Sequence, residues 1–170
     1  GSFGYRHLRV AAGSGVTPVA WQLRYGHERS DEQYPFEFRN GPVTRELTRQ
    51  NADLIVNKWS GALHTALSPR VRLSSYAAYQ DGERGVPGVI AGPYSESRAR
   101  QRDRQAIVQT SVTTVLSPAL SWENRIQGLH SYQRYRDPDL FVGYAPVDNY
   151  YTSRDLRLES HFALQPGSGT

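Results

Sequence analysis

The stretch "LSPRVRLSSYAAYQ", residues 67–80, shows the pattern that sets the fold of the whole chain. It opens with a proline turn and continues with apolar and polar side chains in alternation. One face carries Val71, Leu73, Ala77 and Tyr79, and the other carries Arg72, Ser74, Tyr76 and Gln80. A period of two residues predicts a β-strand that is apolar on one side only.

Similar turns recur along the chain at a nearly constant spacing. Pro18, Pro69, Pro118 and Pro166 lie 51, 49 and 48 residues apart, in the settings "VTP", "LSP", "LSP" and "LQP". Alternating segments flank these turns, and polar stretches rich in Gly, Pro and Tyr separate one pair of segments from the next. A constant period indicates a repeated unit, which here is a long hairpin with a long loop at one end.

The sequence therefore predicts an all-β fold, an antiparallel up-and-down meander of about seven long strands. Short turns are expected near residues 13–17, 65–70, 117–119 and 165–170, and long loops near residues 30–50, 82–102 and 136–152. Strands this long, with all the long loops on one rim, favour an incomplete transmembrane β-barrel. A soluble β-sandwich or barrel is the alternative, because its strands also alternate.

Aromatic residues near the predicted strand ends add to the barrel interpretation, because such residues form girdles at membrane interfaces. They are Trp21, Tyr25, Trp59, Tyr76, Tyr79, Trp122, Tyr132 and Tyr135.

Composition narrows the class of protein only in part. The 170 residues fit one domain, and a formal net charge of +4 is too small to indicate a polyanion-binding protein by itself. The chain has no cysteine, so disulfides and thiolate metal sites are excluded. It also has no methionine and opens directly in strand-like sequence, so we expect a piece of a longer chain.

No pattern of catalytic residues is present. The histidines at 7, 27, 64, 130 and 161 lack the short spacings of zinc ligands. No nucleophile elbow, phosphate-binding loop or dinucleotide fingerprint occurs either. We therefore expect neither an enzyme nor a protein with a metal or cofactor.

Five stretches resemble the early barrel of TonB-dependent outer-membrane receptors, in order and in spacing. They are "GSFGYRHLRVAAG" (1–13), "LRYGHERSDEQYPFEFRN" (23–40), "RQNAD" (49–53), "YAAYQDGERGVPG" (76–88) and "ARQRDRQ" (99–105). The resemblance covers nearly all of residues 1–170 and implies about strands two to eight of a 22-stranded barrel, without the N-terminal plug. The proline turns would then be periplasmic and the long loops extracellular.

The resemblance also implies a function and a place in the cell. Such receptors lie in the bacterial outer membrane and import scarce nutrients such as siderophores or cobalamin. The energy comes from TonB, which contacts the plug region that is absent here. The expected partners are outer-membrane lipid and lipopolysaccharide, a small nutrient ligand and TonB, but no nucleic acid. The alternative is a soluble β-barrel or sandwich that binds an anionic ligand or nucleic acid through its arginine-rich segment.

Three groups of side chains are candidates for binding. Loop aromatics beside carboxylates suit capture of a nutrient ligand: Tyr34, Phe36, Phe38, Tyr144, Tyr150 and Tyr151. Arginines that share a strand face with Ala106 and Val108 suit the phosphates of lipopolysaccharide: Arg98, Arg100, Arg102 and Arg104. Polar side chains on the opposite face are expected to line the lumen or contact the plug: Gln105, Gln109, Glu123, Arg125, Gln127, Arg157 and Glu159.

Overall fold

The computed structural model describes residues 4–31, 33–88, 97–138 and 145–164, and these ranges contain nine strands and no helix. The strands are β1 (Arg6–Ser14), β2 (Val19–Ser30), β3 (Pro35–Asn40), β4 (Val43–Thr48), β5 (Leu54–Ser68), β6 (Val71–Gly85), β7 (Arg100–Ser117), β8 (Leu120–Asp137) and β9 (Val147–Leu164).

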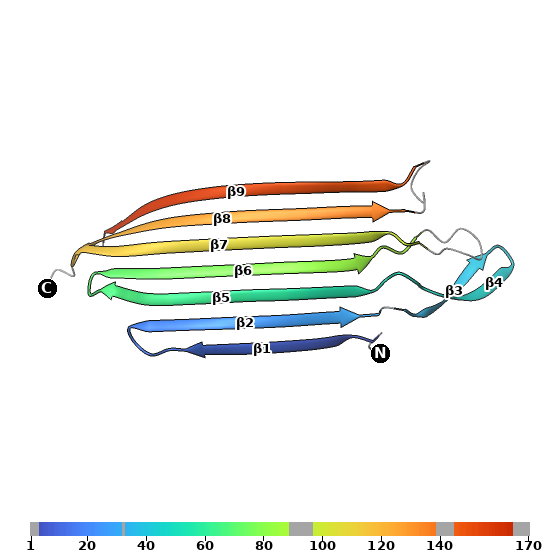
Figure 1. Ribbon diagram of the computed structural model, residues 1–170, viewed down its shortest axis with the longest axis horizontal. Helices are drawn as coiled ribbons and strands as arrows, with labels where there is room; N and C mark the ends of the chain where they lie inside the picture. Colours follow the sequence, from blue (N-terminus) through green and yellow to red (C-terminus); the bar gives the residue numbers. More distant parts are fainter. Residues whose placement is uncertain (1–3, 32, 89–96, 139–144, 165–170) are drawn as a thin grey trace.

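Seven of the strands form one antiparallel sheet in the order β1-β2-β5-β6-β7-β8-β9, so each strand pairs with the next one in the meander (Figure 1). Strands β3 and β4 form a separate hairpin, which projects from the loop end of the sheet (Figure 1). The predicted all-β fold and the seven-stranded antiparallel meander are confirmed. Strands β1 and β9 are the two edges of the described sheet.

Two of the short turns form where proline follows serine. The Ser68 hydroxyl accepts hydrogen bonds from the backbone N–H groups of Arg70 and Val71, at 3.3 and 3.1 Å. The Ser117 hydroxyl accepts one from the N–H of Ala119 at 3.3 Å. Serine thus satisfies backbone donors that a tight turn leaves without a partner. The predicted turn at residues 165–170 lies outside the described residues.

The long strands run further than the sequence predicts. Strands β7, β8 and β9 have 18 residues each. Strand β6 continues to Gly85 and β7 begins at Arg100, both inside the predicted loop at 82–102. Likewise β8 and β9 extend into the predicted loop at 136–152, and the predicted loop at 30–50 contains the β3–β4 hairpin. Charged side chains end the apolar pattern there, but backbone pairing continues through them.

The pairing register assigns every side chain to one of two faces, because directly opposed residues point to the same side of a sheet. We call one side the apolar face. Three consecutive rows of it read Trp21, Leu63, Ser75, Thr110, Ile126, Leu158; then Leu23, Gly61, Ala77, Val108, Gly128, Leu156; then Tyr25, Trp59, Tyr79, Ala106, His130, Arg154. The other side is the polar face, with rows such as Gln22, Ala62, Tyr76, Gln109, Gln127, Arg157.

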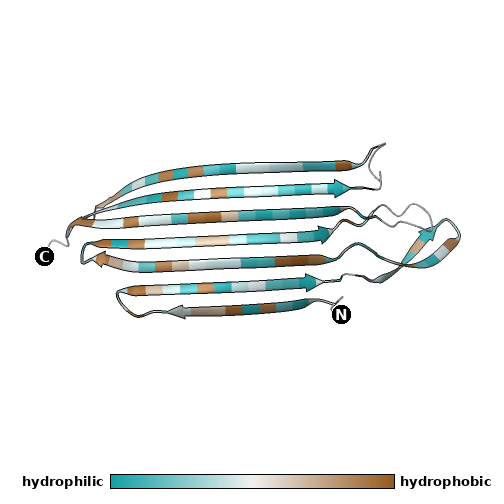
Figure 2. Ribbon diagram, viewed as in Figure 1, coloured by the Kyte–Doolittle hydropathy of each residue, from teal (hydrophilic) through white to brown (hydrophobic). Residues whose placement is uncertain are grey.

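The sheet covers very little apolar surface. Among the described residues, only two apolar side chains are buried, Val56 and Ala99. On the apolar face, Leu23, Val108 and Leu158 keep exposed fractions of 58%, 56% and 69%. Figure 2 shows hydrophobic residues spaced along the strands, with a hydrophobic stretch also at the loop end of β5, whereas the loop ends of β7 and β8 are hydrophilic. The described sheet therefore has no core of its own, and its apolar face is open.

The register corrects part of the predicted aromatic girdle. Tyr76 pairs with Ala62 and Gln109, and Tyr135 pairs with Gln101, so both tyrosines lie on the polar face. A girdle on the apolar face therefore does not include them, because proximity to a strand end does not fix the face. The other six predicted girdle residues lie on the apolar face: Trp21, Tyr25, Trp59, Tyr79, Trp122 and Tyr132.

Candidate functional site

Aromatic side chains border the apolar face at both ends. Toward the loops, the rings of Tyr25 and Trp59 lie 4.2 Å apart, and the Tyr25 hydroxyl donates a 3.0 Å hydrogen bond to Oδ1 of Asn57. Toward the turns, Trp122 stacks on Phe162 with ring centroids 5.6 Å apart. Side chains with an apolar body and a polar tip are typical of borders between apolar and wet surroundings. We call the rows between these borders the apolar belt.

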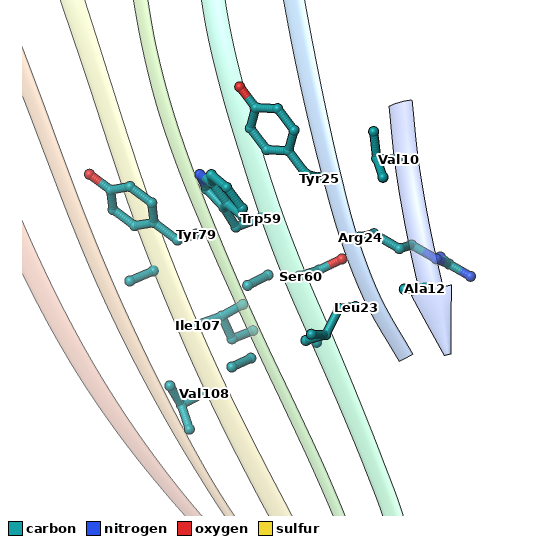
Figure 3. A pocket seen from close by; sticks show the side chains of 14 residues that line it. Val10, Ala12, Leu23, Arg24, Tyr25, Trp59, Ser60, Tyr79, Ile107 and Val108 are labelled. Carbon is teal, nitrogen blue, oxygen red and sulfur yellow. The ribbon is translucent and has the colours of Figure 1, made fainter. Parts of the chain in front are cut away.

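A shallow hollow lies in the apolar belt across β1 to β7 (Figure 3). Its floor is made of residues with small side chains or none: Ala12, Gly61, Ala77 and Ala106. Figure 3 shows Tyr25, Trp59 and Tyr79 at one end of the hollow, with Leu23 and Val108 toward the other. Because large side chains surround small ones, the hollow has the shape and the polarity to hold a hydrocarbon chain.

Charged residues follow the apolar belt toward the loops, on the same face. Arg100 binds both carboxylate oxygens of Asp53, at 2.7 and 2.9 Å, and approaches Glu83 at 3.0 Å. Arg102 binds both oxygens of Asp81, at 2.9 and 2.6 Å. We call the following set the charged band: Asp53, Asp81, Glu83, Arg100, Arg102, Arg104, Arg134, Arg136 and Asp148.

The charged band ends on β8 and β9 with a two-pronged ion pair. Arg134 donates hydrogen bonds to both oxygens of Asp148, at 2.7 and 2.6 Å. These hydrogen bonds lower the pKa of the Asp148 carboxyl from its ordinary value, and the nearby charges of Arg134 and Arg136 act in the same direction. Asp148 therefore stays ionised at neutral pH.

The predicted arginine face is present, and the structure adds partners to it. Arg100, Arg102 and Arg104 lie in β7 on the face of Ala106 and Val108, with the register unbroken. Arg100 and Arg102 are engaged by carboxylates within the chain, whereas Arg104 approaches Asp81 only at 3.4 Å. Arg98 precedes β7. The predicted contact of these arginines with lipopolysaccharide stays a prediction.

A second cluster joins the bases of two loops. Asn51 has a left-handed backbone, with φ of 54°, and its amide donates hydrogen bonds to the carbonyl oxygens of Val86 and Ala99, at 3.1 and 2.8 Å. The Gly85 N–H donates to the carbonyl of Asp53 at 2.8 Å. The predicted motifs "RQNAD", "YAAYQDGERGVPG" and "ARQRDRQ" therefore meet in space. We call the hydrogen bonds of Asn51 and Gly85 the loop clamp. No local sequence pattern indicates it, because it joins residues far apart in the chain.

We predict that Gly85→Ala destabilises the sheet. A Cβ atom on Gly85 would overlap the backbone carbonyl of Asn51, which cannot move without breaking the loop clamp. Forcing atoms into an occupied space costs about 1–3 kcal/mol. The thermal midpoint, followed by circular dichroism in detergent, should fall. Gly128→Ala is the matched control, since a Cβ there meets no atom within 4 Å. Equal midpoints for the two variants would show that the clamp is not rigid.

The polar face carries an ion-pair cluster at the position expected for a lumen wall. Arg125 donates to Glu123 at 2.8 Å along its own strand and to Glu159 at 3.3 Å across to β9. Glu159 also forms an ion pair with Arg157 at 3.0 Å and lies 3.6 Å from His161. Arg125 thus links the pair Arg125–Glu123 on β8 with the pair Arg157–Glu159 on β9.

The predicted loop aromatics do not share one surface. Tyr34 and Phe36 pack edge-to-face with ring centroids 6.4 Å apart at the start of the β3–β4 hairpin, which also carries Phe38. Tyr150 lies on the apolar face of β9, whereas Tyr151 lies on its polar face, because consecutive residues of a strand point to opposite sides. Tyr144 lies outside the described residues.

In the described ranges, no three His, Asp or Glu side chains come together in a group that could hold a metal ion. No helix in the described part of the chain is long and apolar enough to cross a membrane. No protein-family model matches the chain, and no curated protein matches it significantly.

Proposed function

We propose that the chain forms part of the wall of a TonB-dependent outer-membrane receptor. In this proposal the apolar face meets lipid and the polar face lines the lumen. The observation that carries it is the asymmetry between the faces: the apolar belt is open, and only Val56 and Ala99 are buried apolar residues among those described. A soluble sheet would cover such a face with a second layer, because exposed apolar surface of this extent is rare in soluble monomers.

The height of the apolar belt supports the proposal. On β6 the belt spans the nine residues from Val71 to Tyr79. A transmembrane strand needs about 9–11 residues. Eight steps of about 3.3 Å give about 26 Å along the strand, or about 22 Å across the membrane at a tilt of about 35°. This is close to the apolar band of about 25 Å that surrounds outer-membrane barrels.

The stagger of the turns supports the same tilt. Val19, the first residue of β2, aligns across β5 with Leu73, which is two residues past the start of β6. Val71 aligns across β7 with Trp122, two residues past the start of β8. The offset is one residue per strand. With about 3.3 Å per residue and 4.8 Å between strands, turns at one level require a tilt of about 35°, and transmembrane barrels have 35–45°.

The proposal requires further strands beside the two edges of the sheet. Strands β1 and β9 each present unpaired backbone groups on one side of the described sheet. Each such group costs several kcal/mol in hydrocarbon, so a sheet crosses a membrane only when it closes. Transport follows from the family resemblance: the receptor imports a scarce nutrient such as a siderophore or cobalamin with energy from TonB. The ion-pair cluster around Arg125 then forms a charged wall that faces the plug.

The alternative, a soluble protein that binds an anion or nucleic acid through its arginines, has less support. Arg100 and Arg102 already bind carboxylates with two hydrogen bonds each. Among the arginines of β7, only Arg104 lacks a carboxylate bound through two hydrogen bonds. A nucleic-acid site needs several arginines that are free to reach phosphates. We therefore retain the receptor as the proposed function.

Lipid contact along β7 tests the orientation of the faces. We predict that single spin labels at Ala106, Val108 and Val112, attached through introduced cysteines in the chain with its natural flanking sequence, collide with oxygen dissolved in lipid. Labels at Gln105 and Gln109 should instead collide with a water-soluble nickel complex. Electron paramagnetic resonance in lipid nanodiscs measures both. If the collision rates with oxygen and with the nickel complex did not alternate from one residue of β7 to the next, the membrane orientation would be rejected.

Loop aromatics test the nutrient-capture part of the proposal. We expect Tyr34→Ala and Phe36→Ala to reduce ligand affinity and uptake, because each removes one ring of the edge-to-face pair. Loss of such a contact typically costs about 1 kcal/mol or more, which is about fivefold in affinity. Uptake of radiolabelled iron bound to siderophores from the source culture, and of radiolabelled cobalamin, provides the measurement. Glu37→Gln, on the opposite face of β3, is the control, and unchanged uptake in both aromatic variants would remove these residues from the binding site.

A further inference from the structure

Two rows of the sheet place arginine directly opposite arginine. Arg100 pairs with Arg136, and Arg102 pairs with Arg134, all on the apolar face between β7 and β8. Like charges directly opposite each other destabilise a sheet. This repulsion between arginines must be offset, so we expect negative charge beside these two rows.

The carboxylates of the chain compensate only part of this charge. Six arginines lie on this face in strands β7, β8 and β9, namely Arg100, Arg102, Arg104, Arg134, Arg136 and Arg154. Four carboxylates accompany them, Asp53, Asp81, Glu83 and Asp148. Six against four leaves an excess of two positive charges.

The excess falls on three particular arginines. Arg104 lies 3.4 Å from Asp81, whose shorter hydrogen bonds go to Arg102, and its guanidinium stands 5.7 Å from the centre of the Tyr132 ring. Arg136 lies opposite Asp148 and acts on it through its charge, but in the described ranges neither Arg136 nor Arg154 makes an ion pair or a side-chain hydrogen bond. These guanidinium groups therefore have donors available for an outside anion.

Arg104 and Arg154 stand at the border of the apolar belt. Arg154 shares its row with His130 and Ala106, and the next row toward the turns is apolar. Arg104 lies one row further toward the loops, in the row of Tyr132. Long arginine side chains at such a border keep their stems along apolar surface and hold the charge at the level of lipid headgroups.

The apolar hollow begins directly beside this border. Arg104 is followed two residues later on the same face by Ala106, which forms part of the floor of the hollow, and then by Val108. A cationic site and a groove for a hydrocarbon chain are therefore adjacent along β7. Their combination matches a molecule with an anionic head and an apolar tail.

We propose that this surface binds a phosphate-bearing lipid of the outer leaflet. The phosphate is held by Arg104 and Arg154, for which guanidinium geometry is suited, and Arg136 adds attraction from two rows above Arg104. One acyl chain lies in the hollow beside Trp59 and Val108. The inference rests on the proposed function, because it requires that the apolar face meets lipid.

A fluorescent label in the hollow measures this binding. We use the chain with its natural flanking sequence, a bimane label on Val108→Cys, and nanodiscs of phosphatidylcholine. Acyl chains that carry bromine quench bimane on contact. Quenching by brominated phosphatidic acid is compared with quenching by brominated phosphatidylcholine, at equal mole fractions and with identical chains, so that only the headgroup differs.

We expect phosphatidic acid to quench at lower mole fractions than phosphatidylcholine. Arg154→Gln should reduce this preference about fivefold, since an arginine near the surface contributes about 1 kcal/mol of attraction to anionic lipid. Arg154 has no described ion pair to break, so this variant should fold. Arg104→Gln should act in the same direction. Arg157→Gln, on the polar face of the same strand, should leave the preference unchanged.

The outcomes separate the two proposals. Quenching by both lipids with equal strength would overturn the phosphate site but leave the membrane orientation intact. Quenching by neither lipid would overturn both. A preference for phosphatidic acid that survives Arg154→Gln and Arg104→Gln would also overturn the site, because the attraction would then come from elsewhere on the protein.

Discussion

Continuous antiparallel pairing is the constraint on which the rest of this structure depends. Strands of up to 18 residues pair with their neighbours over most of their length, so the choice of register at each short turn decides the face of every side chain. A slip of one residue would exchange the faces. The apolar belt, the charged band and the polar face all follow from that one alignment.

In the proposed receptor, the two faces divide the demands of a membrane wall between them. Polar groups in contact with hydrocarbon are costly, and the charges on the apolar face lie toward the loop end. They begin with Arg154, in the row of Tyr25, Trp59 and Tyr79, and continue beyond it. On the polar face charges occur at any height, and Arg125 pairs with Glu123 and Glu159 well inside the strands. This difference is what a barrel wall requires and what a soluble core does not produce.

The sequence predicted the strand order and most of the face assignments, because alternation is local. It misplaced the strand ends, because pairing continues through charged residues whose partners are distant: Arg100 binds Asp53, 47 residues away. The loop clamp around Asn51 and the excess charge at Arg154 were missed for the same reason. One further result could have been predicted from the sequence. Tyr150 and Tyr151 are adjacent in a strand and therefore had to lie on opposite faces.

The central proposal is that lipid surrounds the apolar face of the sheet. The most direct measurement is therefore a structure of the protein in lipid. Electron cryomicroscopy of the chain with its natural flanking sequence, in lipid nanodiscs, would show what covers each face. The proposed function predicts a closed barrel in which β1 and β9 pair with further strands and in which Val108 and Leu158 contact acyl chains. Protein packed over Val108 and Leu158, with solvent on both sides of the assembly, would contradict it.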